Sequence, residues 1–208
     1  MTNHLTFWTR RTTALLALGA CAVALAQPVA APPTRVRGEL ESFDGATLVV
    51  KDRAGERTSF VLADDFAVNE VLPIELSTIQ PGSYIGTAAI PAADGTLGAI
   101  AITVFPETSR GVGEGHRPWD VQPGSTMTNG TVGDVVVSAA QGRTLTLRYK
   151  EGTQTVVVPV GTAIVTFRPS DRTLLVPGAK VVVTAQTRDG RPTALRVQAG
   201  RNGFMPPS

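Results

Sequence analysis

Short apolar and β-branched runs recur along the chain, and turn-forming residues such as glycine, proline and aspartate separate them. Runs of this length and composition between turn signals predict β-strands. The chain is therefore expected to be all-β. The predicted strands cover residues 36–43, 47–51, 58–62, 84–90, 99–105, 132–139, 144–150, 155–159, 180–186 and 194–199.

The predicted strands fall into two sets of five, and the same turn motifs recur in the same order in both sets. Self-similarity of this kind indicates a duplicated structural unit. It is evidence about architecture and carries no chemistry by itself. The corresponding segments are 44–48 (Asp-Gly-Ala-Thr-Leu) and 141–145 (Gln-Gly-Arg-Thr-Leu), 80–82 and 176–178 (both with Pro-Gly), and 94–95 and 189–190 (both Asp-Gly).

Five strands with an irregular or briefly helical insert after the third are typical of an OB-like barrel. The inserts are predicted at residues 63–80 and 160–176. Each unit of roughly 70 residues is small for an independent core, so the two barrels are expected to pack against each other. The predicted organisation is a first OB-like barrel at 35–107, an ordered linker at 108–131, a second OB-like barrel at 132–199 and a tail at 200–208.

Both halves resemble an uncharacterised family of OB-like β-barrel domains that occur singly or in tandem in exported bacterial proteins. The resemblance rests on a first strand with glycine, a Thr-Leu second strand, a Pro-Gly entry to the fourth strand and a final Asp-Gly hairpin. Members of that family are sometimes labelled automatically as metal transporter permeases. The chain has no apolar stretch of spanning length after residue 26, so the resemblance implies at most a soluble companion of a transporter.

The N-terminal residues 1–26 have the parts of an export signal peptide: Arg10 and Arg11, a short apolar stretch, and a small-residue cleavage site at residues 24–26. The mature chain is expected to begin near Gln27 and to be periplasmic or secreted. Cleavage there removes the only cysteine, so disulfides cannot stabilise the mature protein.

Cys21 supports an alternative fate for the N-terminus. The segment Leu-Gly-Ala-Cys at residues 18–21 resembles a lipobox, which would make the protein a lipoprotein anchored through Cys21. The other interpretation treats Cys21 as an apolar member of the signal core, and the good cleavage site at residues 24–26 favours it. Residues 27–34 contain three prolines and are predicted to form an extended tether.

Charge is distributed unevenly between the two halves. Residues 35–107 contain five basic and eleven acidic residues, a net charge of −6, whereas residues 132–208 contain ten basic and four acidic residues, a net charge of +6. Unlike charges favour docking of the two halves, self-association, or binding of an envelope partner or an anion to the basic half. The simpler alternative is two solvated surfaces of different composition.

The linker contains the only histidine and tryptophan beyond the signal peptide, His116 and Trp119. Trp119 is expected to pack between the two barrels. One hypothesis is a transition-metal site with His116 as the main ligand and Glu114, Asp120 or Met127 as helpers, since imidazole with thioether or carboxylate suits copper, zinc or manganese. Local hydrogen bonding of His116 is the favoured alternative, because one imidazole and no thiolate are few ligands for zinc, and no cofactor is expected.

Templates for catalysis and for nucleic-acid binding fit the sequence poorly. A nucleophile would need a positioned base, and His116 is the sole imidazole after the signal peptide. Paired carboxylates for an envelope carbohydrate-active enzyme are present as Asp64, Asp65, Glu70 and Glu75, but acids of this kind are more often solvated. Few aromatic residues accompany the basic half, and export separates the protein from nucleic acid.

The sequence therefore favours an exported, non-enzymatic binding or scaffolding protein of the cell envelope with an unknown ligand. The alternatives are a periplasmic metal-handling protein with a site around His116 and an envelope carbohydrate-active enzyme.

Overall fold

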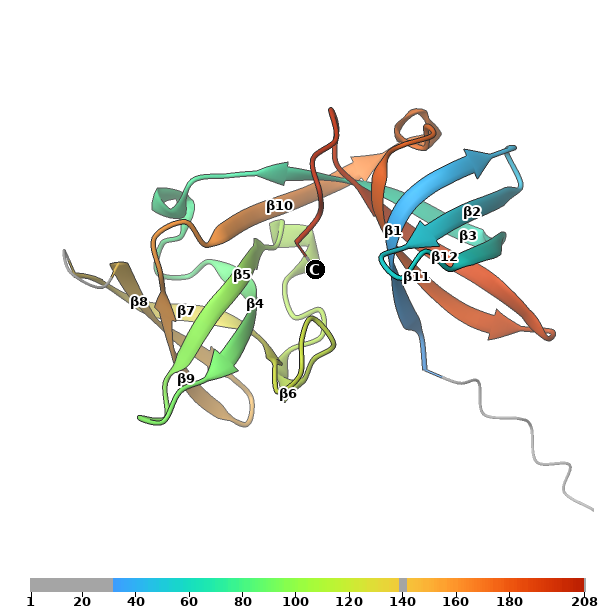
Figure 1. The fold of residues 1–208 in the computed structure, drawn as a ribbon. Coiled ribbons are helices and arrows are strands. Elements are labelled where there is room, and N and C mark those ends of the chain that lie inside the picture. Colours follow the sequence, from blue (N-terminus) through green and yellow to red (C-terminus); the bar gives the residue numbers. More distant parts are fainter. Residues whose placement is uncertain (1–31, 139–141, 208) are drawn as a thin grey trace, which may run out of the picture.

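The computed structural model describes residues 32–138 and 142–207, and these residues form an all-β structure (Figure 1). The predicted signal peptide and Cys21 lie outside the described residues, as does most of the predicted tether. The strands are β1 (Thr34–Phe43), β2 (Thr47–Asp52), β3 (Arg57–Pro73), β4 (Tyr84–Pro91), β5 (Leu97–Val104), β6 (Gly115–Pro118), β7 (Thr126–Ser138), β8 (Gly142–Tyr149), β9 (Gly152–Val158), β10 (Ala163–Ser170), β11 (Lys180–Arg188) and β12 (Arg191–Ala199).

Five strands close into a ring that we call the β1 barrel. Its order is β1, β2, β3, β12 and β11, and antiparallel pairing of β11 with β1 closes it. The pairing of β3 with β12 is parallel and covers six residue pairs. The interior is a core of buried side chains from β1, β2, β3, β11, β12 and the 3-10 turn Arg172–Leu174, among them Leu40, Leu48, Phe60, Val181 and Val197.

Five further strands, β4, β5, β7, β8 and β9, surround a second core and form what we call the β7 group. The core includes Ile85, Ile102, Leu145 and Val156, all fully buried. Strand β5 runs parallel to β9 over two residue pairs, from Leu97 with Val156 to Gly98 with Val157, and parallel to β10 over four further pairs. Figure 1 shows the β1 barrel and the β7 group side by side.

Each core draws its strands from both halves of the sequence. Strands β1 and β3 pair with β11 and β12, while β4 pairs with β7 and β5 pairs with β9 and β10. The prediction that residues 35–107 close one barrel and residues 132–199 the other therefore does not describe the pairing. The two halves have exchanged their last two strands within one chain.

The long strand β3 makes the crossing between the two cores. Residues 63–80 were predicted to be an irregular insert, but the strand continues through Val68 and Val71 to Pro73 and ends before the 3-10 turn Leu76–Thr78. It pairs with β12 of the β1 barrel as far as Glu70, and its last residues pair only with β10. Strand β3 therefore carries the chain from the β1 barrel to the β7 group.

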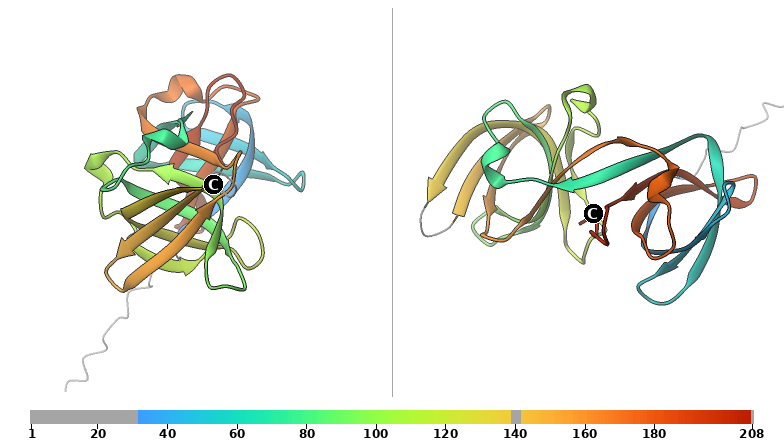
Figure 2. Two further views of the ribbon diagram at one scale, coloured as in Figure 1. Left: turned by 90° about the vertical axis from the view of Figure 1, so that its left-hand side faces the viewer. Right: turned by 90° about the horizontal axis from the view of Figure 1, so that it is seen from above.

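Strand β10 carries the chain back in the opposite direction. It lies in residues 160–176, the second predicted insert, and runs antiparallel to β3 from Val165 opposite Pro73 to Ser170 opposite Val68. The two crossing strands form a ribbon that joins the β1 barrel to the β7 group, as the view from above shows (Figure 2). The ribbon fixes the two cores beside each other.

Each of the ten predicted strands overlaps an observed one, but β3 extends eleven residues beyond the predicted end at residue 62, and β7 begins six residues before the predicted start at residue 132. The sequence missed β6, β10 and the second half of β3. Residues 126–131 of the predicted linker belong to β7, and residues 115–118 form β6 along the edge of β7, so this segment is ordered as expected.

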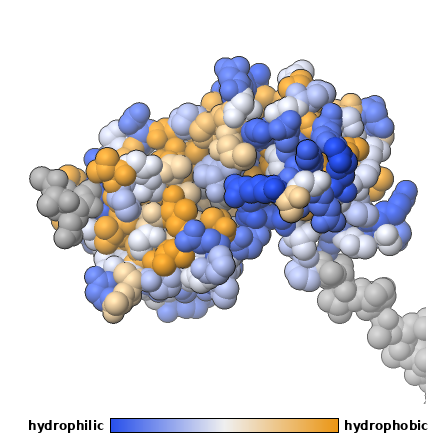
Figure 3. Space-filling model, in the orientation of Figure 1, coloured by the Kyte–Doolittle hydropathy of each residue, from blue (hydrophilic) through white to orange (hydrophobic). Residues whose placement is uncertain are grey.

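The surface differs between the two strand groups. Strongly hydrophilic residues are concentrated over the β1 barrel, whereas apolar and weakly polar residues cover more of the β7 group (Figure 3). No helix in residues 32–138 and 142–207 is long and apolar enough to cross a membrane.

Candidate ligand-binding cleft

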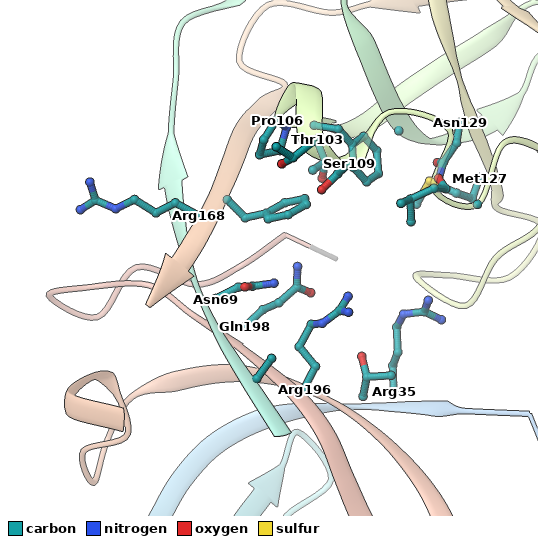
Figure 4. A pocket seen from close by; sticks show the side chains of 18 of the residues that line it. Arg35, Asn69, Thr103, Pro106, Ser109, Met127, Asn129, Arg168, Arg196 and Gln198 are labelled. Carbon is teal, nitrogen blue, oxygen red and sulfur yellow. The ribbon is translucent and has the colours of Figure 1, made fainter. Parts of the chain in front are cut away.

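A cavity of about 560 Å³, which we call the central cleft, lies between the β1 barrel and the β7 group. One wall is the outer face of β1, β11, β12 and the second half of β3, and the other is the outer face of β4, β5, β6 and β7. The segment 105–113 and strand β10 bound the remaining sides. Side chains from both walls point into this space (Figure 4).

The wall of the β1 barrel is polar and basic. Arg35 lies opposite Thr184 on β11, and Thr184 lies opposite Arg196 on β12, so the three side chains share one row on the outer face. Asn69 and Gln198 pair one row away. In Figure 4 the side chains of Arg35, Arg196, Gln198 and Asn69 all point toward the open space.

The wall formed by the β7 group has fewer charged side chains than the wall formed by the β1 barrel. Asn129 and Met127 lie on β7 and are directed at the cleft (Figure 4). Gly86 lies opposite Asn129, and a Cβ atom at this position would come within 2.7 Å of Asn129 Oδ1 and 2.9 Å of the Phe105 ring. Glycine at position 86 therefore allows the Asn129 carboxamide and the Phe105 ring to approach the strand.

Aromatic rings form one end of the cleft. Phe105 packs edge to face against Phe167 at 5.7 Å between centroids, and it also contacts Tyr84 at 5.3 Å. Burial raises the pKa of Tyr84, and the nearby charge of Glu114 adds to that effect. Phe105 and Phe167 give this end of the cleft an apolar lining.

Contacts between β1 and the segment after β6 cover the opposite side of the cleft. Arg37 donates two hydrogen bonds to the Asp120 carboxylate, at 2.8 and 3.2 Å. The Arg35 guanidinium carbon lies 4.1 Å from the centre of the Trp119 ring, and that of Arg117 lies 5.2 Å from it. Trp119 thus links β6 to β1 through contacts with arginines.

The central cleft has an uncompensated positive charge. Its lining includes Arg35, Arg117, Arg168 and Arg196 but no aspartate or glutamate among the described residues. Arg168 points away and pairs with Glu70. Within the described chain, the other three have no carboxylate within ion-pair distance.

The electrostatic surroundings of Arg35 agree with this excess of positive charge in the cleft. Burial lowers the pKa of Arg35, the charges of Arg37 and Arg117 lower it further, and only Asp120 opposes them. Burial likewise lowers the pKa of Arg117. An anion in the cleft would stabilise the charged forms of both arginines.

Two buried polar atoms at the cleft lack a hydrogen-bond partner within the described chain. Asn129 is 5% exposed, and its Nδ2 donates to the Val112 carbonyl, but its Oδ1 accepts nothing. Trp119 Nε1 is also buried without an acceptor. Buried polar atoms are nearly always paired, so Asn129 and Trp119 bring to the cleft lining hydrogen-bonding capacity that the described chain leaves unused.

The structure does not bring the four predicted metal ligands together. His116 is exposed, and its Nδ1 hydrogen-bonds to Thr128 Oγ1 at 2.8 Å, whereas Met127 is buried against the central cleft. Glu114 accepts a hydrogen bond from the backbone of Lys150, and Asp120 pairs with Arg37. Across residues 32–138 and 142–207, no three His, Cys, Asp or Glu residues cluster as metal ligands would. The metal site stays a prediction without geometric support.

The four predicted catalytic carboxylates are also dispersed. Asp64, Asp65 and Glu75 are exposed, while Glu70 is 2% exposed and bonded to Arg168 and Arg201. Burial tends to raise the pKa of Glu70, but the hydrogen bonds and charges of the two arginines outweigh it and lower the pKa. A general acid of a glycosidase needs the opposite shift.

Sequence reasoning missed most of the cleft residues, because it treated the basic residues of the second half as surface charge. The available signal was the outward position of Arg196 and Gln198, which alternate with the core residues Val197 and Ala199 on β12. Nothing in the sequence placed Arg35 beside them, since that requires the exchanged pairing of β1 with β11.

Comparison of the chain with protein-family models, with curated proteins and with solved structures finds no match. The geometry of the central cleft is therefore the basis for any functional conclusion.

Proposed function

We propose that the chain is an exported, non-enzymatic binding protein of the cell envelope, and that its ligand lies in the central cleft. In this proposal the β1 barrel and the β7 group are two OB-like barrels that have exchanged strands, and they act as rigid walls for the site. The observation that carries the proposal is the pair of unpartnered buried atoms, Asn129 Oδ1 and Trp119 Nε1, beside one large cavity.

The size and composition of the cleft support a small ligand. A volume of about 560 Å³ lies within the range of small-molecule sites, roughly 300 to 1,000 Å³. Such sites combine apolar surface with a few convergent polar groups, and the central cleft has an apolar end at Phe105 and Phe167 beside a polar and basic wall. Strand β10 of the ribbon bounds the space on one side, and Trp119 lies among the lining residues beside Arg35.

A blocking variant tests the proposal without changing any charge. Ala67 lies on β3 in the wall of the β1 barrel, and Ala67→Phe would fill part of the central cleft. The wild-type protein and this variant are screened by thermal shift against sugars, peptides and organic acids. We expect compounds that raise the melting temperature of the wild type and not that of Ala67→Phe.

Ser59→Phe is the matched control, because Ser59 is exposed on the same strand and does not line the cleft. It is expected to respond as the wild type does. Compounds that stabilise all three proteins equally, or a complete lack of stabilising compounds, would contradict a binding function for the central cleft. Export is tested separately by the mass of the mature protein, which is expected to begin at Gln27.

A further inference from the structure

The positive charge of the central cleft identifies the chemical class of its ligand. We propose that the site binds a small organic anion, with its carboxylate or phosphate group held by Arg35 and Arg196 and its apolar body directed at the Phe105 and Phe167 rings. This inference rests on the binding function proposed above and adds the charge and orientation of the ligand to it.

Arg35 and Arg196 are placed so that both side chains can reach the same ligand. Both flank Thr184 on the outer face of the β1 barrel, so their Cα atoms are about two strand spacings, or roughly 10 Å, apart. Arginine side chains of that separation can reach one oxyanion between them, and both point into the open space (Figure 4). Two guanidiniums present donors in planar pairs that match carboxylate and phosphate oxygens.

No carboxylate of the described chain competes with a ligand for Arg196. Arg196 forms no hydrogen bond or ion pair in the described part of the chain, although the chain has Glu70 and Asp120 on neighbouring segments. Those two carboxylates are occupied by Arg168 with Arg201, and by Arg37. Within the described chain, no carboxylate therefore competes with an external anion for Arg35 or Arg196.

The opposite side of the cleft is mainly apolar. Phe105 and Phe167 form its apolar end, and Met127 lies on the wall of the β7 group, where the arginine of β6, Arg117, contacts the Trp119 ring. Asn129 Oδ1 is a buried acceptor on the same wall. An anion with a flat apolar body and one hydrogen-bond donor would satisfy both walls. Inorganic anions alone would leave the apolar wall and Asn129 Oδ1 unsatisfied.

The test uses three probes that share one ring and differ in the group attached to it: benzoate, phenyl phosphate and benzamide. Binding to the full mature chain is measured by isothermal titration calorimetry and by the fluorescence of Trp119. We expect both anions to bind at least about tenfold more tightly than benzamide, because hydrogen bonds to charged groups contribute more than neutral ones. The preferred anion distinguishes a carboxylate ligand from a phosphate ligand.

Charge-neutralising variants locate the anionic group. Arg196→Gln and Arg35→Gln should each weaken binding of the anions by about tenfold and leave benzamide unchanged. Arg191→Gln is the matched control, because Arg191 is an exposed arginine on β12 outside the cleft. Binding of the anions should also weaken as salt rises.

The outcomes separate this inference from the proposed function. If benzamide binds as well as benzoate and Ala67→Phe blocks it, the central cleft binds ligands but the anion assignment is wrong. If neither anion binds at about 10 mM, or if Arg196→Gln and Arg191→Gln behave alike, the assignment is also overturned. If no compound of any charge binds, both proposals fail.

Discussion

The β1 barrel and the β7 group have the same order of strands but present different chemistry to each other. Gly38 and Gly130 occupy equivalent places, since a Cβ atom at either would collide with a backbone carbonyl of the neighbouring strand. From that correspondence, Arg35 on β1 is equivalent to Met127 on β7.

The neighbouring positions of the same row differ in the same way. Thr184 lies opposite Arg196 in the β1 barrel, and the equivalent pair in the β7 group is Ala88 opposite Ala101. One row is therefore basic and polar, and the other is small and apolar. The two groups therefore share their order of strands, whereas the outer faces that form the central cleft differ in their side chains.

The two groups of strands close in the same way. Strand β12 pairs with β3 over six residue pairs, and β5 pairs with β9 over two and with β10 over four. In the β1 barrel one long strand provides this edge, whereas in the β7 group two successive strands share it.

The largest effect is expected from separating the two halves of the chain. Each core contains strands from both halves, so neither fragment, 32–123 or 124–207, can complete a core alone. A protease site introduced at the exposed turn beside Gly124 would produce the two fragments from folded protein. We expect them to stay together through gel filtration in about 1 M salt, where surface charges are screened within about 3 Å, because strand pairing holds them.

Isolated expression provides the contrast. Fragment 32–123 alone is expected to show no cooperative melting transition as a monomer. A fragment that folds alone and ignores its counterpart would contradict the exchanged pairing and favour two barrels that close within their own halves. Dissociation of the cleaved protein at high salt would instead mean that the opposite net charges of the two halves hold it together.

The second comparison uses two equivalent leucines, Leu48 of the β1 barrel and Leu145 of the β7 group. Both are fully buried in the repeated Thr-Leu motif. Leu48→Ala and Leu145→Ala should each lower the free energy of unfolding by about 2 to 5 kcal/mol, measured by denaturant titration. Because both halves of the chain enter both cores, each variant should unfold in a single transition. Two separate transitions would show that the rings are independent.

Much of the secondary structure could be predicted, because local turn chemistry and β-branched runs determine it. The ribbon could have been predicted as strand as well: residues 162–167, Thr-Ala-Ile-Val-Thr-Phe, have strand composition. The five strands that already account for an OB-like unit favour an insert at these residues instead. The partner of each strand could not be predicted, since local patterns do not distinguish a return into the same ring from a crossing to the other.

The cleft was unpredictable for the same reason. The residues that line it are ordinary surface arginines and amides until β1, β11 and β12 are placed in one ring. The linker is ordered as predicted. However, His116 on β6 and Met127 on β7 belong to neighbouring cross-strand pairs, so their side chains point to opposite faces and meet different environments. Their closeness in the sequence predicts a shared metal site, but successive side chains of a strand point to opposite faces, and this separates the two residues.

A smaller effect is expected from Glu70, which joins β3 of the ribbon to Arg168 on β10 and to Arg201. Glu70→Gln should lower the melting temperature at neutral pH, although less than the leucine variants, because solvent screens the two arginines. The pKa of Glu70 is lowered in the folded protein. Its contribution is therefore present above the unfolded pKa of about 4.3 and is lost as the pH falls through the folded value.

Thermal melts of wild type and Glu70→Gln across this pH range check the prediction. The gap between the two proteins should be constant near neutral pH and narrow under acidic conditions. The control is Asp134→Asn, which breaks an exposed ion pair with Arg148 and should change little. A gap that widens as the pH falls would show that Glu70 is not held as a carboxylate in the folded state.

The smallest effect is expected from Trp119, whose ring contacts Arg35 of the β1 barrel and Arg117 beside it. The ring is only half-buried, so its arginine contacts rather than core packing determine its contribution. Trp119→Ala should cost about 1 to 2 kcal/mol, in the range of partly desolvated cation–π contacts, and Trp119→Phe should cost less. Denaturant titration compares both with Leu145→Ala.

Because Trp119 is the only tryptophan after residue 8, its emission reports the same contact, and Arg35→Gln should shift that emission in the folded protein. A loss in Trp119→Ala as large as that in Leu145→Ala would make Trp119 a core residue that joins the two rings, and the wall of the central cleft would then be fixed by packing instead of by its arginines.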